Sequence, residues 1–282
     1  MAETSTAEPE ESEEPRGLGA VLKAAARPLI DVPMDFLAEL GIMARLVYET
    51  FMWAIRPPYR GSQLIDALEF LGVQSIFIVG LTGTFVGGVF SLQLVNALRA
   101  FGAESQAGAA IGLALARELA PVFSALMITS RAGSAIATEI ASMRVTNQID
   151  ALTTMSVNPV QYLIVPRVVA ATIATPIMAL LAFLVGLGGA YLVGVHIMGV
   201  DGGIFYEKVT WNVDVDDVLQ GLIKAAVFGF ALTMIACRQG FYATGGAAGV
   251  GRATNRAVVQ ASVAILILDY ILTAIIINYE LL

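Results

Sequence analysis

Ionisable residues interrupt several stretches of the chain that are otherwise apolar. Arg117 and Glu118 are adjacent in the stretch 106–142, whereas Lys224 and Asp269 each stand alone in a later apolar stretch. An ionisable side chain at membrane depth is costly, so it usually faces a cavity, a partner group or water. These residues are therefore candidates for contacting the polar part of a substrate, or for pairing between helices.

Two interpretations of Arg117 and Glu118 stay open. Neighbouring residues of a helix point about 100° apart, so these two side chains cannot pair face to face. In one interpretation they line a substrate cavity, and Pro121 loosens the helix beside them. In the other they form ion pairs that fix helix packing, for instance with Lys224 or Asp269. The residues that we expect at a cavity are Glu118, Arg117, Pro121, Leu94 and Phe90.

The composition indicates a membrane protein. The chain has 282 residues, of which 57% are hydrophobic and 14% charged, and its mean hydropathy is +0.76. Soluble domains are roughly 45–50% apolar and about 25% charged. One Cys and one His exclude a disulfide framework and a Cys/His zinc cluster. Lys and Arg do not cluster as they do in nucleic-acid-binding domains. From these two observations we expect neither a bound metal nor a nucleic-acid partner.

Five apolar stretches predict five transmembrane helices, because a bilayer core of about 30 Å needs roughly 20 helical residues. They cover about residues 73–97, 106–142, 168–194, 218–236 and 257–277. The second is longer than the bilayer is thick, so we expect it to project into water or to bend near Pro121. Glycines four residues apart predict closely packed helices at Gly83/Gly87 and Gly108/Gly112.

Two segments of different composition precede the first predicted span. Residues 1–17 are acidic and nearly free of large apolar side chains, which predicts a disordered cytoplasmic tail. Residues 18–60 combine apolar residues at helical spacing with frequent charges, which predicts an amphipathic helix in the membrane interface. A helix packed on another subunit would show the same pattern. The remaining residues, 61–282, form the membrane domain of an all-α polytopic protein.

The distribution of charge predicts the orientation. Most of the 16 Lys and Arg residues precede the first span or lie in the loops after the second and fourth, whereas the loop 195–217 is acidic. Loops rich in Lys and Arg stay in the cytoplasm. We therefore expect a cytoplasmic N-terminus and a C-terminus on the outer side.

The loop between the second and third spans contains a short amphipathic helical pattern over 145–155. Val145, Ile149 and Leu152 fall on one side, and Thr146 or Asn147 could begin the helix. Such a helix on the cytoplasmic face could receive force from a soluble motor, or could rest on lipid. The candidate contact residues are Arg144, Thr146, Asn147, Gln148, Asp150 and Leu152.

The stretch from Ala116 to Leu152, ARELAPVFSALMITSRAGSAIATEIASMRVTNQIDAL, resembles the MlaE/YrbE-type permeases. The resemblance continues through Asn158-Pro159 and Val165-Pro166-Arg167 and extends over roughly residues 30–282. Two positions depart from the family pattern: Ala120 stands where Gly is usual, and Asn147 where Glu is common. The loss of that Glu puts the details of the ATPase contact in doubt.

The resemblance implies the membrane subunit of an MCE-associated ABC lipid transporter in the bacterial inner membrane. It implies a homodimer with lipid, expected to be phospholipid, in a cavity between the copies, and it matches the family's functional glutamate to Glu118. It implies that 145–155 is a coupling helix bound by a cytoplasmic ABC ATPase, which would bind ATP and Mg²⁺. A periplasmic MCE-domain protein is a further implied partner, and a small cytoplasmic accessory subunit can be another.

The chain itself is not expected to be an enzyme. Its glycine-rich stretch 246–251 is followed by Arg252 and Ala253, whereas a phosphate-binding loop needs Lys and then Ser or Thr. A proton- or ion-coupled secondary transporter that uses Glu118 and Asp269 is the alternative function. Such transporters are commonly built from repeated halves, and this sequence contains no duplicated segment.

Overall fold

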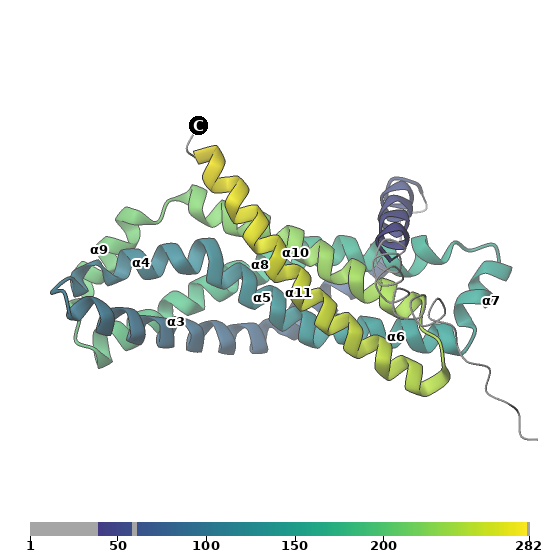
Figure 1. Cartoon of the computed structure of the whole chain (residues 1–282), viewed down its shortest axis with the longest axis horizontal. Helices are drawn as coiled ribbons and strands as arrows, with labels where there is room; N and C mark the ends of the chain where they lie inside the picture. The colour runs from purple at the N-terminus through teal and green to yellow at the C-terminus, as the bar shows by residue number, and fades with distance from the viewer. Residues whose placement is uncertain (1–38, 58–60, 281–282) are drawn as a thin grey trace, which may run out of the picture. The chain divides into compact units, whose positions relative to one another are not determined.

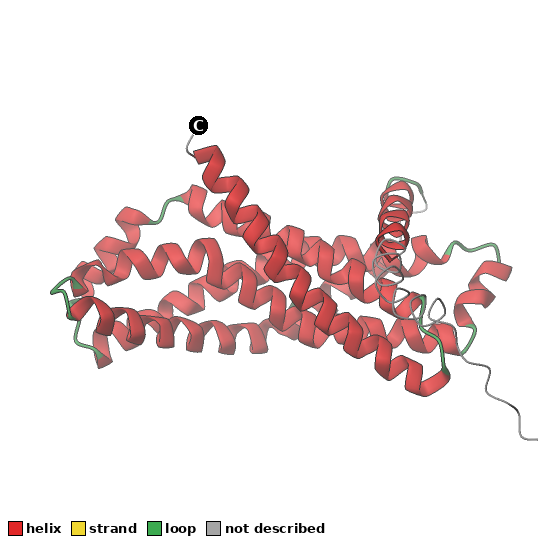
Figure 2. Ribbon diagram, in the orientation of Figure 1, coloured by secondary structure: helices red, strands yellow, loops and turns green. Residues whose placement is uncertain are grey.

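The computed structural model describes residues 39–57 and 61–280, and its regular elements in these ranges are all helical (Figures 1 and 2). The predicted tail 1–17 lies outside the described residues, as does much of the predicted interfacial segment 18–60. Within that segment, residues 39–54 form a helix. The prediction of an all-α polytopic membrane protein is confirmed.

Five helical runs are long and apolar enough to cross a membrane, and all belong to the second of two units, Leu46–Leu282; the first is Met1–Arg45. The runs are Gly61–Arg99, Glu104–Val145, Val160–Ile197, Val215–Phe241 and Gly246–Asn278. Each run contains one predicted span, so the number and order of the membrane helices are confirmed.

The first run is interrupted near Gly72. It consists of α2 (Gly61–Leu71), a 3-10 turn (η1, Val73–Ser75) and α3 (Ile76–Arg99). An interrupted helix leaves carbonyl groups without their usual amide partners. The guanidinium of Arg131 lies at this break and donates to the carbonyl of Phe70 at 2.6 Å and to Oγ of Ser75 at 3.1 Å.

The second run is helical throughout but is interrupted by two π turns. Its parts are a 3-10 turn (η2, Glu104–Gln106), α4 (Ala107–Ala114), a π turn (η3, Leu115–Leu119), α5 (Ala120–Ile128), a second π turn (η4, Thr129–Gly133) and α6 (Ser134–Val145). Single π turns inside α-helices are frequent at functional sites. The first π turn contains Arg117 and Glu118 and ends just before Pro121.

The short helix α7 (Gln148–Thr154) connects the second run to the third. The later elements are a π turn (η5, Val160–Ile164), α8 (Val165–Tyr191), another π turn (η6, Leu192–Ile197), α9 (Gly202–Asn212), α10 (Val215–Phe241) and α11 (Gly246–Glu280). Helix α8 packs against α2, α3, α5 and α10, while α10 also contacts α6 and α11.

Glycines bring helix backbones into direct contact, as their spacing predicts. A Cβ added at Gly87 would overlap the carbonyl oxygen of Gly186 on α8. A Cβ added at Gly83 would lie 3.0 Å from the carbonyl oxygen of Ala182, also on α8. The pair Gly83/Gly87 therefore sets a close approach of α3 to α8.

Candidate functional site

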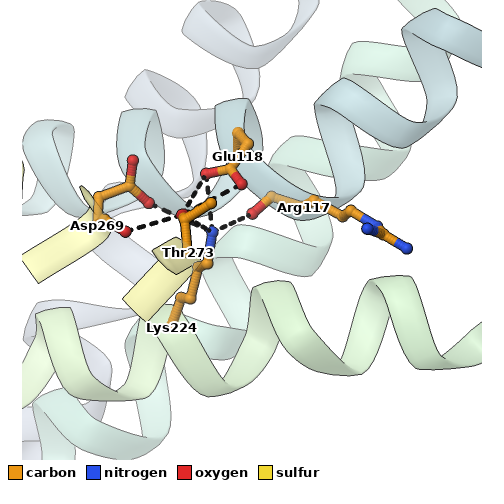
Figure 3. Close-up of polar contacts among 5 residues, drawn as sticks. All are labelled: Arg117, Glu118, Lys224, Asp269 and Thr273. Carbon is orange, nitrogen blue, oxygen red and sulfur yellow. Dashed lines mark hydrogen bonds and ion pairs between the residues drawn. The ribbon is translucent and has the colours of Figure 1, made fainter. Parts of the chain in front are cut away.

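A buried lysine lies where three of the helical runs meet. The Lys224 side chain on α10 is 2% exposed. Around it lie groups from η3 and from α11, and together they form what we call the Lys224 cluster: Arg117, Glu118, Lys224, Asp269 and Thr273 (Figure 3). A buried ammonium is tolerated only when its charge and its N–H groups are compensated.

Each of the three N–H groups of Lys224 has an acceptor. The Nζ atom donates to Oε2 of Glu118 at 2.8 Å, to Oγ1 of Thr273 at 2.7 Å and to the main-chain carbonyl of Arg117 at 3.1 Å. An ammonium offers three donors, so its hydrogen-bonding capacity is fully used. Lys224 is thus held firmly by two other helical runs.

Pro121 explains why the Arg117 carbonyl is available. In a regular α-helix this carbonyl would accept from the amide four residues later, but residue 121 is proline and has no N–H. The Lys224 ammonium supplies a donor in its place. The proline thus creates an acceptor inside the membrane region, and the lysine satisfies it.

Asp269 adds a second carboxylate to the cluster. Its Oδ1 atom is 3.6 Å from Nζ of Lys224, is buried, and makes no hydrogen bond in the part of the chain that the structure describes. Thr273 lies one turn further along α11 and its hydroxyl is 2.8 Å from the Asp269 carbonyl and 3.3 Å from both carboxylate oxygens of Glu118. Two carboxylates therefore face one ammonium.

Arg117 points away from Lys224, in agreement with its position next to Glu118 (Figure 3). Its Nε donates to Oδ1 of Asp217 at 2.6 Å, in the first turn of α10. The other oxygen of Asp217 accepts from the amide of Asp214 at 2.8 Å, which closes the capping box of that helix. Adjacent residues of η3 thus bond to two different levels of α10.

The side chains of the cluster differ in exposure. The Glu118 side chain is 37% exposed and that of Arg117 35%, whereas that of Asp217 is 5% exposed. Glu118 and Arg117 are therefore the most exposed charged side chains of the cluster, ahead of Asp269 at 22%. Within residues 39–57 and 61–280, no three His, Cys, Asp or Glu side chains are grouped so that they could hold a metal ion.

The expected cavity residues do not all lie together. Glu118 and Arg117 belong to the Lys224 cluster, and Pro121 is buried four residues beyond Arg117. Phe90 and Leu94 are half-buried on α3, which packs mainly against α8. The structure therefore separates Phe90 and Leu94 from the other three candidates.

Two residues of the site escaped the sequence analysis, Asp217 and Thr273. Asp217 precedes Lys224 by seven residues, and Thr273 follows Asp269 by four, so each lies on the same helix face as an ionisable residue already noted. That spacing was the available signal. A search of the same helix face around each charged residue would have found both.

The predicted coupling segment 145–155 is shorter as a helix. Val145 ends α6, and Asn147 adopts a left-handed conformation, with φ of 60°, before α7 begins at Gln148. Asn147 occupies the N-cap position, but its side chain makes no capping hydrogen bond. Ile149 is buried. The exposed candidate residues are Thr146, Asn147, Gln148 and Asp150, while Arg144 and Leu152 are half-buried.

Asp150 is held by its neighbour at the end of α6. Its Oδ1 accepts from Nη1 of Arg144 at 2.6 Å. The Asp150 side chain nevertheless remains 59% exposed. Helix α7 therefore presents a polar face with a carboxylate that is already oriented.

A comparison with protein families matches residues 64–275 to the permease MlaE family model. The chain belongs to the MlaE permease family. The matched range includes the whole Lys224 cluster and α7, so the family resemblance of the 116–167 region is confirmed. With its five apolar helical runs, this MlaE-family chain is an integral membrane protein.

Relatives with curated descriptions extend this MlaE-family assignment. A probable ABC transporter permease protein of Rickettsia felis is 41% identical over 85% of this chain and 93% of its own length. The intermembrane phospholipid transport system permease protein MlaE of Haemophilus influenzae is 38% identical over 86% of this chain and 93% of its own length. The chloroplastic TRIGALACTOSYLDIACYLGLYCEROL 1 protein of Arabidopsis thaliana is 36% identical over 74% of this chain and 60% of its own length.

Proposed function

We propose that this chain is the permease subunit of an ATP-driven transporter that moves phospholipid between the inner membrane and a periplasmic MCE-domain protein. The observation that carries the proposal is the Lys224 cluster, which places ionised groups inside an apolar bundle and leaves Glu118 37% exposed. Ionisable groups in membrane segments commonly mark a substrate path. The Haemophilus influenzae relative is named as the permease of a phospholipid transport system, which supports the same cargo.

The cluster suits the polar end of a lipid. Arg117 is 35% exposed and places a guanidinium, held by Asp217, beside the cluster, whereas Lys224 is 2% exposed and occupied by acceptors from its own chain. Glu118, the next residue in the chain after Arg117, presents a negative charge. A headgroup that carries both phosphate and a cationic group would find both counter-charges. The half-buried Phe90 and Leu94 on α3 would line the apolar part of a cavity shared by two copies of the chain.

Coupling to ATP hydrolysis would pass through α7. Its exposed polar residues, with Asp150 fixed by Arg144, form a surface that a cytoplasmic ABC ATPase can bind. In this arrangement ATP and Mg²⁺ belong to the ATPase, and the present chain has no catalytic role. With α7 on the cytoplasmic side of the membrane, five spans place the N-terminus in the cytoplasm and the C-terminus in the periplasm. A small cytoplasmic accessory subunit could join the complex.

A proton-coupled carrier is the second candidate, and one observation favours it. Asp269 Oδ1 is buried without a hydrogen bond among the described residues, and two carboxylates share one ammonium, so the cluster has a place for a proton. In that mechanism Glu118 and Asp269 would exchange the proton, and no ATPase would be needed.

Reconstitution distinguishes the two. The chain and its ATPase, placed in donor vesicles, should transfer fluorescent phospholipid to acceptor MCE protein only when ATP is present. Glu118→Gln should reduce that transfer at least tenfold, whereas Glu104→Gln, in the same helical run but outside the cluster, should not. Transfer driven by a pH gradient without ATP would contradict the proposal and support the carrier.

A further inference from the structure

A second polar site lies far from the Lys224 cluster. It is a pocket of about 370 Å³, within the roughly 300–1,000 Å³ typical of small-molecule sites. Glu139, which lies on it, follows Glu118 by 21 residues in the same helical run, or about 30 Å at 1.5 Å per residue. The pocket is formed by α2, α6, η5 and the start of α8, and its polar lining is Gln63, Asp66, Glu139, Tyr162 and Arg167.

Arg167 is fixed on one side of this pocket. Its Nη2 is 2.7 Å from Oε1 of Glu139, its Nη1 donates to the carbonyl of Leu163 at 3.1 Å, and its side chain is 16% exposed. The Glu139 side chain, by contrast, is 58% exposed. The guanidinium is therefore fixed in the wall of the pocket, while the Glu139 side chain that holds it is largely accessible.

The polar groups of the pocket favour a ligand that donates hydrogen bonds and carries positive charge. Two carboxylates, those of Asp66 and Glu139, and one guanidinium, that of Arg167, line the pocket. Oε1 of Gln63 is buried and has no hydrogen-bond partner among the described residues. A buried acceptor without a donor is unfavourable. An ammonium group has three donors and no acceptor, so its hydrogen-bonding capacity matches these three acceptor groups in number.

The surroundings indicate that the ligand also has an apolar part. Phe70, Leu71 and Leu163 line the same pocket. The run that contributes α2 continues into α3, where Phe77 is 78% exposed, and Ile65 on α2 is 65% exposed. Acyl chains could lie along this exposed apolar surface while the headgroup enters the pocket.

We propose that this pocket binds the phosphoethanolamine headgroup of a membrane phospholipid. The ammonium contacts Gln63, Asp66 and Glu139, and the phosphate lies toward Arg167. This site is separate from the Lys224 cluster, and it would bind lipid whether or not the chain transports it. Its position beside α6 and η5, the elements that flank α7, would let a bound lipid stabilise the segment that carries α7.

Headgroup selectivity tests the proposal directly. The full chain in detergent micelles is titrated by calorimetry with dihexanoyl phosphatidylethanolamine, phosphatidylcholine and phosphatidylglycerol. Phosphatidylcholine has the same net charge but no N–H donor, so we expect it to bind at least tenfold more weakly than phosphatidylethanolamine. Equal affinity for these two lipids, or tighter binding of phosphatidylglycerol, would overturn the proposal.

Variants locate the binding. Asp66→Asn and Gln63→Leu should each weaken phosphatidylethanolamine binding at least fivefold, whereas Glu69→Gln, on the same helix but outside the pocket, should leave it unchanged. Gln63→Glu adds a carboxylate of nearly the same size and should tighten binding, a gain that partial unfolding cannot produce. If the preference for phosphatidylethanolamine survives Asp66→Asn and Gln63→Leu, the amine binds elsewhere and the proposal is wrong.

Discussion

The Lys224 cluster and the glycine contact between α3 and α8 connect helices of one bundle by opposite means. In the cluster, side chains from three runs meet through hydrogen bonds of 2.7–3.1 Å to one ammonium. In the glycine contact, Gly87 lies so close to the backbone of Gly186 that no side chain fits between them. Side-chain contacts can be exchanged for others by rotation about single bonds, whereas a backbone contact is lost only when the helices separate.

The helices of the glycine contact and the helix α11 of the cluster also differ in how many of their residues are buried. In the apolar stretch of α11, 11% of the residues are buried, against 50% in the run that contains α8. Helix α11 contributes Asp269 and Thr273 to the cluster, and its buried apolar side chains are Ala253, Ala257, Ala261 and Ile265, most of them small. We therefore expect the α3–α8 pair to be the fixed part of the permease, and α11 with the cluster to be the part that can rearrange during transport.

The largest effect is expected from Lys224→Met. The change leaves Glu118 and Asp269 close together without their cation, and breaking a buried ion pair costs about 3 kcal/mol or more of the free energy of unfolding. Thermal unfolding in detergent measures the loss, with Lys208→Met on α9 as the control.

Neutralising the carboxylates should restore stability to the lysine variant. When Glu118→Gln and Asp269→Asn accompany Lys224→Met, no uncompensated charge remains. The triple variant should therefore unfold close to the wild-type temperature but transport no lipid. A single variant Lys224→Met as stable as the wild type would show that the cluster does not hold the helices together.

Gly87→Ala should follow, with a loss of about 2 kcal/mol, because its methyl group overlaps the Gly186 carbonyl and overpacking typically costs 1–3 kcal/mol. Gly80→Ala on the same helix is the matched control, since its Cβ would meet nothing within 4 Å. Unfolding temperatures of the two variants give the comparison. Equal temperatures would mean that α3 and α8 are not held at this glycine.

The sequence was sufficient for the membrane helices because each needs a long, predominantly apolar stretch, and such stretches are visible without any knowledge of packing. It also named Lys224 and Asp269 as possible ion-pair partners of Arg117 and Glu118, since few other charges lie at membrane depth. The choice between them depends on how each helix is rotated about its axis. Each π turn adds a residue to a helical turn and shifts that rotation, and only Pro121 hinted at the first of them.

The Asp217 partner of Arg117 was missed for a different reason. Asp217 belongs to the acidic group of the loop 195–217 and the first turn of the next helix, so its charge was attributed to the aqueous surface. In the structure its side chain is 5% exposed and also caps α10. A residue that caps a helix at the membrane boundary can therefore also pair with a charged side chain inside the bundle. Composition alone does not distinguish such a buried acidic residue from one at the aqueous surface.

A smaller effect on the cluster is expected from Thr273→Val. The change keeps the size of the side chain but removes one of the three acceptors of Lys224, which should cost about 1 kcal/mol. Thr172→Val on α8 is the control, because that hydroxyl bonds to the carbonyl of Val168 on its own helix. Chemical unfolding should show a loss for the first variant and almost none for the second. The reverse order would mean that α11 is not held through Lys224.

The smallest effect on stability, and a large effect on function, is expected from Asp150→Lys. The pair of Asp150 with Arg144 is exposed, and such pairs contribute less than about 1 kcal/mol. Assembly with the ATPase and lipid-stimulated ATP hydrolysis should nevertheless fall at least fivefold, because the variant reverses the charge on α7. Glu207→Lys, an equally exposed reversal on α9, should change neither. If Asp150→Lys left assembly and hydrolysis intact, α7 would not be the coupling surface, and force would have to enter the bundle at another loop on the same side.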